Sequence, residues 1–187
     1  MNPTPCRLAP IASAGDDADR DLRHMAHALR LARRAAGRGE VPVGAVAVLG
    51  GRVLAAAGNR MEASQDATQH AEMVVLRRAA RRLGSWRLLG VTLYATLEPC
   101  TMCAGALVLS RVDRLVYGAD DPRRGGVHSV LPVLTHPANN HHLEVTSGLC
   151  AAPAAALLRQ FFAARRTAGA ADPGPDTPGA PAGGRGR

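Results

Sequence analysis

Apolar residues recur at helical spacing in the first part of the chain, while most of the nearby arginines fall off that stripe. An apolar residue every three or four positions is typical of a helix with one buried face, so the pattern predicts an amphipathic helix over residues 21–37. Gly37 and Gly39 end it. The apolar positions that define the stripe are Leu22, Met25, Leu29, Ala32 and Ala36.

Two runs of β-forming residues follow, at 41–49 and 52–58, and Gly50-Gly51 separates them. Paired glycines between two such runs favour a tight turn, so we expect a β-hairpin. The next segment, 59–69, is polar and without periodicity.

The remaining pattern alternates helices with short strands. The strand at 91–97 is apolar on both faces, which is typical of a central strand. Pro99 stands where a proline commonly opens a helix. The expected elements are a helix at 70–83, a strand at 91–97, a helix from Pro99 to about Ser110, strands at 114–117 and 143–146, and a helix at 154–166.

Strands that alternate with helices after an opening hairpin predict the α/β class, as a three-layer α/β/α sandwich around a five-stranded mixed sheet. A chain of 187 residues suits one such domain, which we place at 21–167. Residues 1–20 and the Gly/Pro/Ala-rich stretch 168–187 are expected to be flexible tails. No stretch has the length and hydrophobicity of a membrane span or a secretory signal, which favours a cytoplasmic protein.

Positive charge is concentrated in the expected domain. The formal charge of the chain is +8, and residues 21–167 hold 19 arginines against 10 acidic residues, a net +9. Such an excess favours a phosphate backbone as partner, although a solvated surface accounts for it equally well. Aromatic residues make up only 3% of the chain, so few are available to stack on bases.

The four cysteines are Cys6, Cys100, Cys103 and Cys150. Without an export signal, a Cys-x-x-Cys pair points to metal binding or redox chemistry rather than to disulfides. No thioredoxin-like context surrounds the pair, and metal binding is therefore favoured.

Cys100 and Cys103 stand three residues apart at the start of a predicted helix. This spacing places both side chains on one side of the helix, and a helix N-terminus favours thiolates, the form that binds zinc. By itself, the pair is equally compatible with a structural zinc site or a redox pair.

His70 and Glu72 open an earlier helix, two residues apart. On a helix this spacing turns the side chains about 200° from each other, which indicates that His70 binds metal while Glu72 faces water and substrate. Three protein ligands leave a fourth tetrahedral position open, as in catalytic zinc sites. The alternatives are helix capping by His-x-Glu, or a structural site that Cys150 or another histidine completes.

His-x-Glu followed by Pro-Cys-x-x-Cys is the known signature of zinc deaminases. Residues from about 22 to 166 resemble the bacterial tRNA-specific adenosine deaminase family, which has the cytidine deaminase-like fold. Thr-Leu-Glu-Pro-Cys-Thr-Met-Cys-Ala-Gly-Ala at 96–106 carries most of the resemblance. The other matching segments are 40–45, 58–60, 70–72, 110–111, 117–119 and 161–162.

The resemblance implies a role for each matching position. It makes Glu72 the catalytic proton shuttle and Asn59 a hydrogen-bond partner of the flipped base. Asp121 would contact the sugar of the target nucleotide, and Asn140 and His141 would lie near the RNA. Asn59 and Asp121 are also ordinary turn residues in their local sequence. The zinc ligands that the resemblance implies are His70, Cys100 and Cys103.

Three positions depart from the family pattern. Gln69 replaces a small residue before the metal histidine, His128 stands where glycine is usual, and Pro132 stands where an acidic residue is common. These positions belong to the expected RNA-facing region, so they bear on the substrate rather than on the zinc chemistry.

The function implied is hydrolytic deamination of adenosine to inosine at the wobble position of a tRNA anticodon, with an arginine tRNA as substrate, Zn2+ as cofactor and a homodimer as the assembly. One alternative is a deaminase of free guanine, cytosine or a nucleoside, against which the arginine surplus weighs. Another is a catalytically silent, zinc-stabilised RNA-binding module, against which the intact Glu72 weighs.

Overall fold

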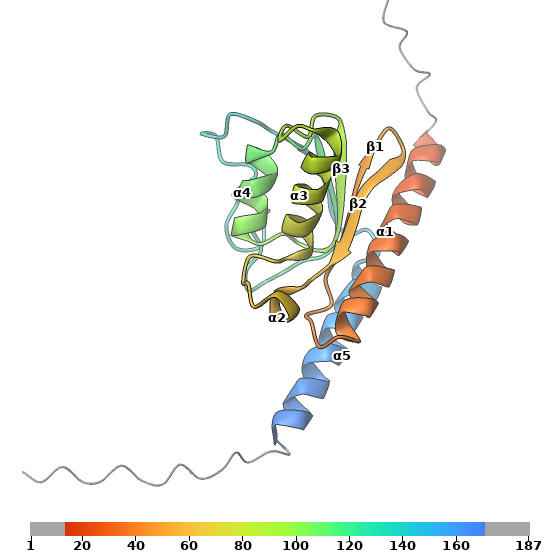
Figure 1. Ribbon diagram of the computed structural model, residues 1–187, viewed down its shortest axis with the longest axis vertical. Coiled ribbons are helices and arrows are strands. Elements are labelled where there is room, and N and C mark those ends of the chain that lie inside the picture. Colours follow the sequence, from red (N-terminus) through yellow and green to blue (C-terminus); the bar gives the residue numbers. More distant parts are fainter. Residues whose placement is uncertain (1–13, 171–187) are drawn as a thin grey trace, which may run out of the picture.

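The computed structural model describes residues 14–170 and consists of one mixed β-sheet between two layers of helices (Figure 1). The predicted three-layer α/β/α sandwich with five strands is confirmed. Strands pair in the order β2-β1-β3-β4-β5. The strands are β1 (Gly44–Leu49), β2 (Arg52–Gly58), β3 (Val91–Leu97), β4 (Arg114–Ala119) and β5 (Glu144–Thr146).

Two helices cover each face of the sheet (Figure 1). On one face, α1 (Ala14–Ala36) packs against β1 and β3, and α5 (Ala151–Ala170) packs against β4. On the other face lie α3 (Ala71–Leu83) and α4 (Thr101–Leu109). The short helix α2 (Met61–Ser64) lies in the connection between β2 and α3.

Alternating side chains of the strands supply both cores. Val46, Tyr94 and Val116 are buried beneath α1 and α5. Their neighbours along the strands point the other way and pack under α3 and α4, because successive strand residues face opposite sides. Helix α1 approaches β1 so closely that a Cβ on Gly44 would lie 2.1 Å from the carbonyl oxygen of Ala28.

The first helix departs from its prediction. It begins at Ala14 rather than at residue 21, so part of the expected N-terminal tail is helical. Ion pairs one turn apart, such as Asp17 with Arg20, stabilise these early turns. Leu22, predicted to be buried, is 47% exposed, because the buried face of the helix runs through Asp21 and Met25 instead.

Other boundaries differ by a few residues. The first strand begins at Gly44 rather than at 41, the fourth extends to Ala119, and the predicted irregular segment 59–69 contains α2. The last helix begins at Ala151 and includes residues 168–170 of the expected C-terminal tail. The rest of the two predicted tails, 1–13 and 171–187, lies outside the described residues. None of the described helices is both long enough and apolar enough to cross a membrane.

Strand direction brings the starts of two helices together. Strand β1 is antiparallel to both β2 and β3, so β2 and β3 run in the same direction. Their carboxyl ends therefore lie on the same side of the sheet. The chain leaves β2 towards α3 and leaves β3 towards α4. Both helices therefore begin at the carboxyl ends of parallel strands, which is the usual place for a site in α/β folds.

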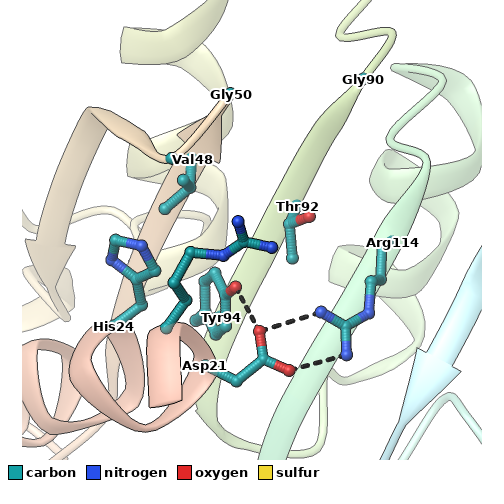
Figure 2. Close-up of a pocket in the computed structure, with 10 residues that line it drawn as sticks. Asp21, His24, Val48, Gly50, Gly90, Thr92, Tyr94 and Arg114 are labelled. Carbon is teal, nitrogen blue, oxygen red and sulfur yellow. Dashed lines mark hydrogen bonds and ion pairs between the residues drawn. The ribbon is translucent and has the colours of Figure 1, made fainter. Parts of the chain in front are cut away.

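A buried polar cluster near the amino-terminal ends of β3 and β4, far from the starts of α3 and α4, attaches α1 to the sheet (Figure 2). Asp21 accepts hydrogen bonds from the hydroxyl of Tyr94 at 2.6 Å and from two guanidinium nitrogens of Arg114 at 2.9 and 2.7 Å. Arg114 also donates to the hydroxyl of Thr146 on β5. This cluster joins one helix to three strands, and it explains why an aspartate occupies an inward-facing position of α1.

Replacing Asp21 by asparagine is expected to lower the free energy of unfolding by about 2 kcal/mol, because Arg114 would lose its buried carboxylate partner and keep only the exposed Glu144. Burial opposes ionisation of Asp21, but the bonds from Arg114 and Tyr94 prevail and lower its pKa. Its stabilising effect is therefore complete above the ordinary aspartate pKa and is lost as the pH falls through the lowered one. Urea unfolding at pH 7 and at acid pH measures both effects, and equal stability of D21N and wild type at pH 7 would contradict this account.

Candidate metal centre

Three metal-binding side chains converge where α3 and α4 begin. The Nδ1 atom of His70 lies 3.5 Å from the sulfur of Cys100 and 3.5 Å from the sulfur of Cys103. All three ligand atoms lie within 4.8 Å of one another. One nitrogen and two sulfurs at this spacing are compatible with a single metal ion between them.

The backbone explains how these side chains meet. His70 and Cys100 are the N-cap residues of α3 and α4 and have extended φ and ψ angles, so neither is yet helical. The sequence-based geometry, which counted His70 as the first helical residue and turned Glu72 about 200° away, is therefore wrong in that detail. The extended residue directs His70 back towards α4, and Glu72 in the first turn of α3 stays on the same side.

The two cysteines have opposite protonation preferences. A hydrogen bond from Cys103 and another from His70 lower the pKa of Cys100 to about 4, against the opposing effect of burial. The same hydrogen bond, burial and the nearby Glu72 raise the pKa of the Cys103 thiol. The opposite shifts mean that the two sulfurs share one proton, and a metal ion bound by both sulfurs displaces that proton.

Glu72 is buried beside the cluster, where the Cys103 thiol contacts its carboxyl group. It is 3% exposed, and its Oε2 atom has no hydrogen-bond partner among the described residues. Burial raises the pKa of Glu72 to about 7, although the His70 charge and the Cys103 thiol favour its ionised form. A buried carboxyl group that titrates near neutral pH is suited to transferring protons.

Asn59 attaches the start of α3 to the end of β2. It is 4% exposed, and its side-chain oxygen accepts a hydrogen bond of 2.9 Å from the backbone N–H of Ala71. Its amide nitrogen makes no hydrogen bond to the described residues, so this donor remains available. A contact of this donor with a base stays a prediction from the resemblance.

An open cleft of about 400 Å³ lies over two of the three ligands. Arg123 and Arg124 line it and are exposed, which makes it attractive to phosphate groups. Two exposed apolar side chains, Val130 and Leu131, stand beside them. The remaining lining residues are Ala67, His70, Cys100, Thr101 and Met102.

The other predicted contacts differ in position. Asp121 is partly buried, and its carboxylate accepts bonds from the backbone of Arg123 and Arg124, so it forms the turn on which these arginines sit. Asn140 and His141 instead bind Arg111 and Val112, beyond the far end of α4. That helix is about 13 Å long, at 1.5 Å per residue. The structure does not bring Asn140 and His141 to the cleft.

The three departures from the family pattern do not line the cleft. Gln69 donates its side-chain amide to Asp66, His128 bonds with the hydroxyl of Tyr117 at 2.7 Å, and Pro132 is exposed. Their effect on the cleft is therefore indirect, through the backbone of the segments that carry them.

Sequence reasoning missed two buried carboxylates around the site, Glu40 and Glu98, each 1% exposed. Glu40 accepts hydrogen bonds from the backbone of Glu62 and Ala63, at the start of α2. Glu98 accepts bonds from the loop that follows β4. Their position could have revealed them. Both lie inside the matching segments 40–45 and 96–106, and an acidic residue in apolar surroundings needs hydrogen-bond partners.

The chain is similar to known deaminases over most of its length. The family model of the MafB19-like deaminases matches residues 19–166. A tRNA-specific adenosine deaminase of Agrobacterium fabrum is 50% identical over 139 residues, which cover 74% of this chain and 91% of that protein. The tRNA-specific adenosine deaminase of Bacillus subtilis is 46% identical over 142 residues, which cover 76% of this chain and 88% of the relative. The chain belongs to the tRNA-specific adenosine deaminase family.

Solved structures extend the likeness of this family member to three dimensions. A structure from work on A-to-I editing by tRNA:A34 deaminases at the wobble position is 48% identical, with a TM-score of 0.71, and the match covers 73% of this chain and 99% of that one. A guanine deaminase from Nitrosomonas europaea is 27% identical, with a TM-score of 0.63 and coverage of 76% and 84%. Both have the fold described here.

Cys103→Ser is expected to reduce bound divalent metal from about one ion per chain to near zero, because a hydroxyl replaces one of three ligands. The matched control is Cys150→Ser, which changes a cysteine outside the cluster. Metal affinity of the wild type should also fall as the pH falls, since binding displaces the proton of Cys103. Metal analysis after dialysis measures each, and a metal-loaded C103S variant would contradict the assignment.

Proposed function

We propose that this chain hydrolyses adenosine to inosine at the wobble position of a tRNA anticodon, with one Zn2+ ion held by His70, Cys100 and Cys103. The observation that carries the proposal is the buried, unpartnered oxygen of Glu72 beside a three-ligand cluster. Relatives at 46–50% identity that act on tRNA support the substrate.

The donor set fits zinc. Two sulfurs and one imidazole nitrogen suit this ion, and three protein ligands are the usual number for a catalytic site. The orphaned oxygen of Glu72 fits the same assignment, because a buried oxygen without a donor costs stability, and the reacting water would supply the missing donor. When bound, zinc supplies a Lewis acid that lets a water molecule lose its proton near neutral pH.

Glu72 carries the protons of the reaction. It accepts a proton from the attacking water, whose oxygen forms a bond to C6 of the adenine base. Glu72 passes this proton to the ring nitrogen, takes the second proton from the new hydroxyl group on C6 and gives it to the amine, so the C6–N6 bond breaks, a C6 carbonyl forms and ammonia leaves. We infer that the amide donor of Asn59 orients the base and that Arg123 and Arg124, which line the cleft, bind the phosphates.

A buried proton carrier argues against a silent RNA-binding module, because such a module has no use for it. The guanine deaminase likeness leaves a free base as the second candidate substrate, at a lower identity of 27%. We favour RNA because two exposed arginines line an open cleft, as a polyanionic substrate requires. Since tRNA is the proposed substrate, we place the reaction in the cytoplasm.

The deciding assay offers the zinc-loaded protein a transcribed arginine anticodon stem-loop with A at the wobble position. We expect inosine in this RNA and no ammonia from free guanine, cytosine or adenosine. A stem-loop with G at the wobble position is the matched control. Release of ammonia from a free base without any inosine in RNA would transfer the assignment to the second candidate.

Glu72→Ala is expected to keep zinc and RNA binding but to lower turnover on the stem-loop at least about 100-fold, the usual contribution of general acid–base catalysis. Single-turnover kinetics, together with zinc analysis and an RNA-binding titration, measure the three properties separately. Substantial turnover in this variant would refute the proton-transfer mechanism.

We further propose a homodimer, as the family resemblance implies. Exposed apolar side chains near the cleft and on α4 support it, since Leu109, Val130 and Leu131 are 73%, 46% and 54% exposed. Sedimentation at micromolar concentration is expected to give twice the 19.5 kDa mass of one chain. A monomer at that concentration would count against the dimer, and Leu109→Ser tests whether α4 contributes to it.

A further inference from the structure

Glu98, between the end of β3 and the metal ligand Cys100, holds a whole loop with its carboxylate. One oxygen accepts bonds from the backbone N–H groups of Val127, His128 and Ser129, at 3.0, 2.9 and 3.0 Å. The other accepts the N–H of Asp121 at 3.0 Å and the hydroxyl of Ser129. Five donors from residues 120–131, here called the 120–131 loop, therefore converge on one side chain.

The loop also packs tightly against the backbone of the metal site. Gly125 forms a β-bridge with Cys100, and a Cβ there would lie 2.4 Å from the Glu98 carboxylate. Gly126 donates its N–H to the carbonyl of Pro99, and a Cβ there would lie 2.8 Å from the Cys100 backbone. Only glycine fits at Gly126, where a Cβ would meet backbone, and a Cβ at Gly125 would displace the Glu98 carboxylate, so the loop is in direct contact with the segment that carries Cys100.

This loop forms one wall of the cleft. Arg123, Arg124, Val130 and Leu131 line the cleft. The N–H of Leu131 donates to the carbonyl of Gly125, which connects the second half of the wall to the part that Glu98 holds. The position of the wall relative to the metal ligands therefore depends on Glu98.

A carboxylate suits this role better than any other side chain. When ionised it only accepts hydrogen bonds, with room for about four lone-pair contacts on two oxygens. A glutamine has nearly the same shape, but its NH2 group in place of the second oxygen would face the N–H of Asp121, so that contact would be lost and the Ser129 hydroxyl would have to accept instead of donate. Glu98 does not line the cleft and its oxygens are occupied, which excludes it from direct contact with the substrate.

We propose that Glu98 is a positioning residue that sets the 120–131 loop as the RNA-facing wall of the cleft, and so determines how tightly the anticodon loop is held over the metal site. The RNA part of this inference rests on the function proposed above. The attachment of the loop itself does not.

The test is Glu98→Gln in the zinc-loaded full chain. KM for the stem-loop is expected to rise about tenfold or more, with a much smaller change in kcat, because ground-state binding weakens while the reacting groups stay in place. Zinc content should equal that of the wild type. Hydrogen–deuterium exchange should become faster at the backbone amides of residues 121–131 and remain unchanged in the strands.

Two further variants make the result specific. Ser129→Ala removes only one of the five donors, so the same changes should appear in smaller size, and this variant serves equally well if E98Q does not fold. Asp21→Asn is the matched control. It alters another buried carboxylate, near the amino-terminal ends of β3 and β4. This variant is expected to have lower thermal stability, with unchanged KM and unchanged hydrogen–deuterium exchange in the 120–131 loop.

Unchanged KM and unchanged loop exchange in E98Q would overturn the proposal. So would a loss of zinc, since Glu98 would then support the metal ligand rather than the loop. If the wild type forms no inosine, the proposed function fails, and the exchange measurement on the zinc-loaded protein still decides whether Glu98 holds the loop.

Discussion

The common direction of β2 and β3 is the constraint on which the site depends. Because the carboxyl ends of both strands lie on the same side of the sheet, α3 and α4 begin side by side. The Nδ1 atom of the N-cap residue His70 lies 3.5 Å from the sulfur of the N-cap residue Cys100. Each of these residues is extended rather than helical, which allows its side chain to turn towards the other helix. If β1 paired parallel to β3, then β2 and β3 would run in opposite directions. The two helices would start on opposite sides of the sheet, and no metal site could form from these residues.

The buried carboxylates of the described chain fall into two groups that differ in their partners. Asp21, Glu40 and Glu98 each accept hydrogen bonds from several donors, and each attaches one segment to another. Glu72 alone among these four keeps an oxygen without a partner, at the point where the metal-binding side chains meet. Burying a carboxyl group without donors costs stability, so its persistence indicates a chemical role, whereas the satisfied carboxylates have structural roles.

The function proposed here depends on the neighbourhood of the cluster as much as on the cluster. A zinc-binding trio and a proton carrier suit the deamination of many amino-substituted rings, and the guanine deaminase likeness reflects this. The wall of the cleft makes the difference, because an open cleft with two exposed arginines admits a polyanion. Glu98 connects the metal-binding cluster with the wall of the cleft, because it follows β3, precedes Cys100 and holds the loop that bears Arg123 and Arg124.

The sequence by itself determined the order of the strands and the four long helices, the sheet class and the three residues of the candidate metal cluster, because local periodicity and a short motif with fixed spacing encode them. It placed Met25, Leu29 and Ala32 correctly on the buried face of α1, but it could not show that Asp21 also belongs to that face. Leu22 was expected inside, but Asp21 takes that place because Arg114 and Tyr94, 93 and 73 residues away, satisfy its charge. For the same reason it missed Glu98, whose five donors lie 23 to 31 residues further along the chain. Hydrogen bonds between distant segments leave no periodic trace, so the tertiary structure alone decided which polar groups hold the site together.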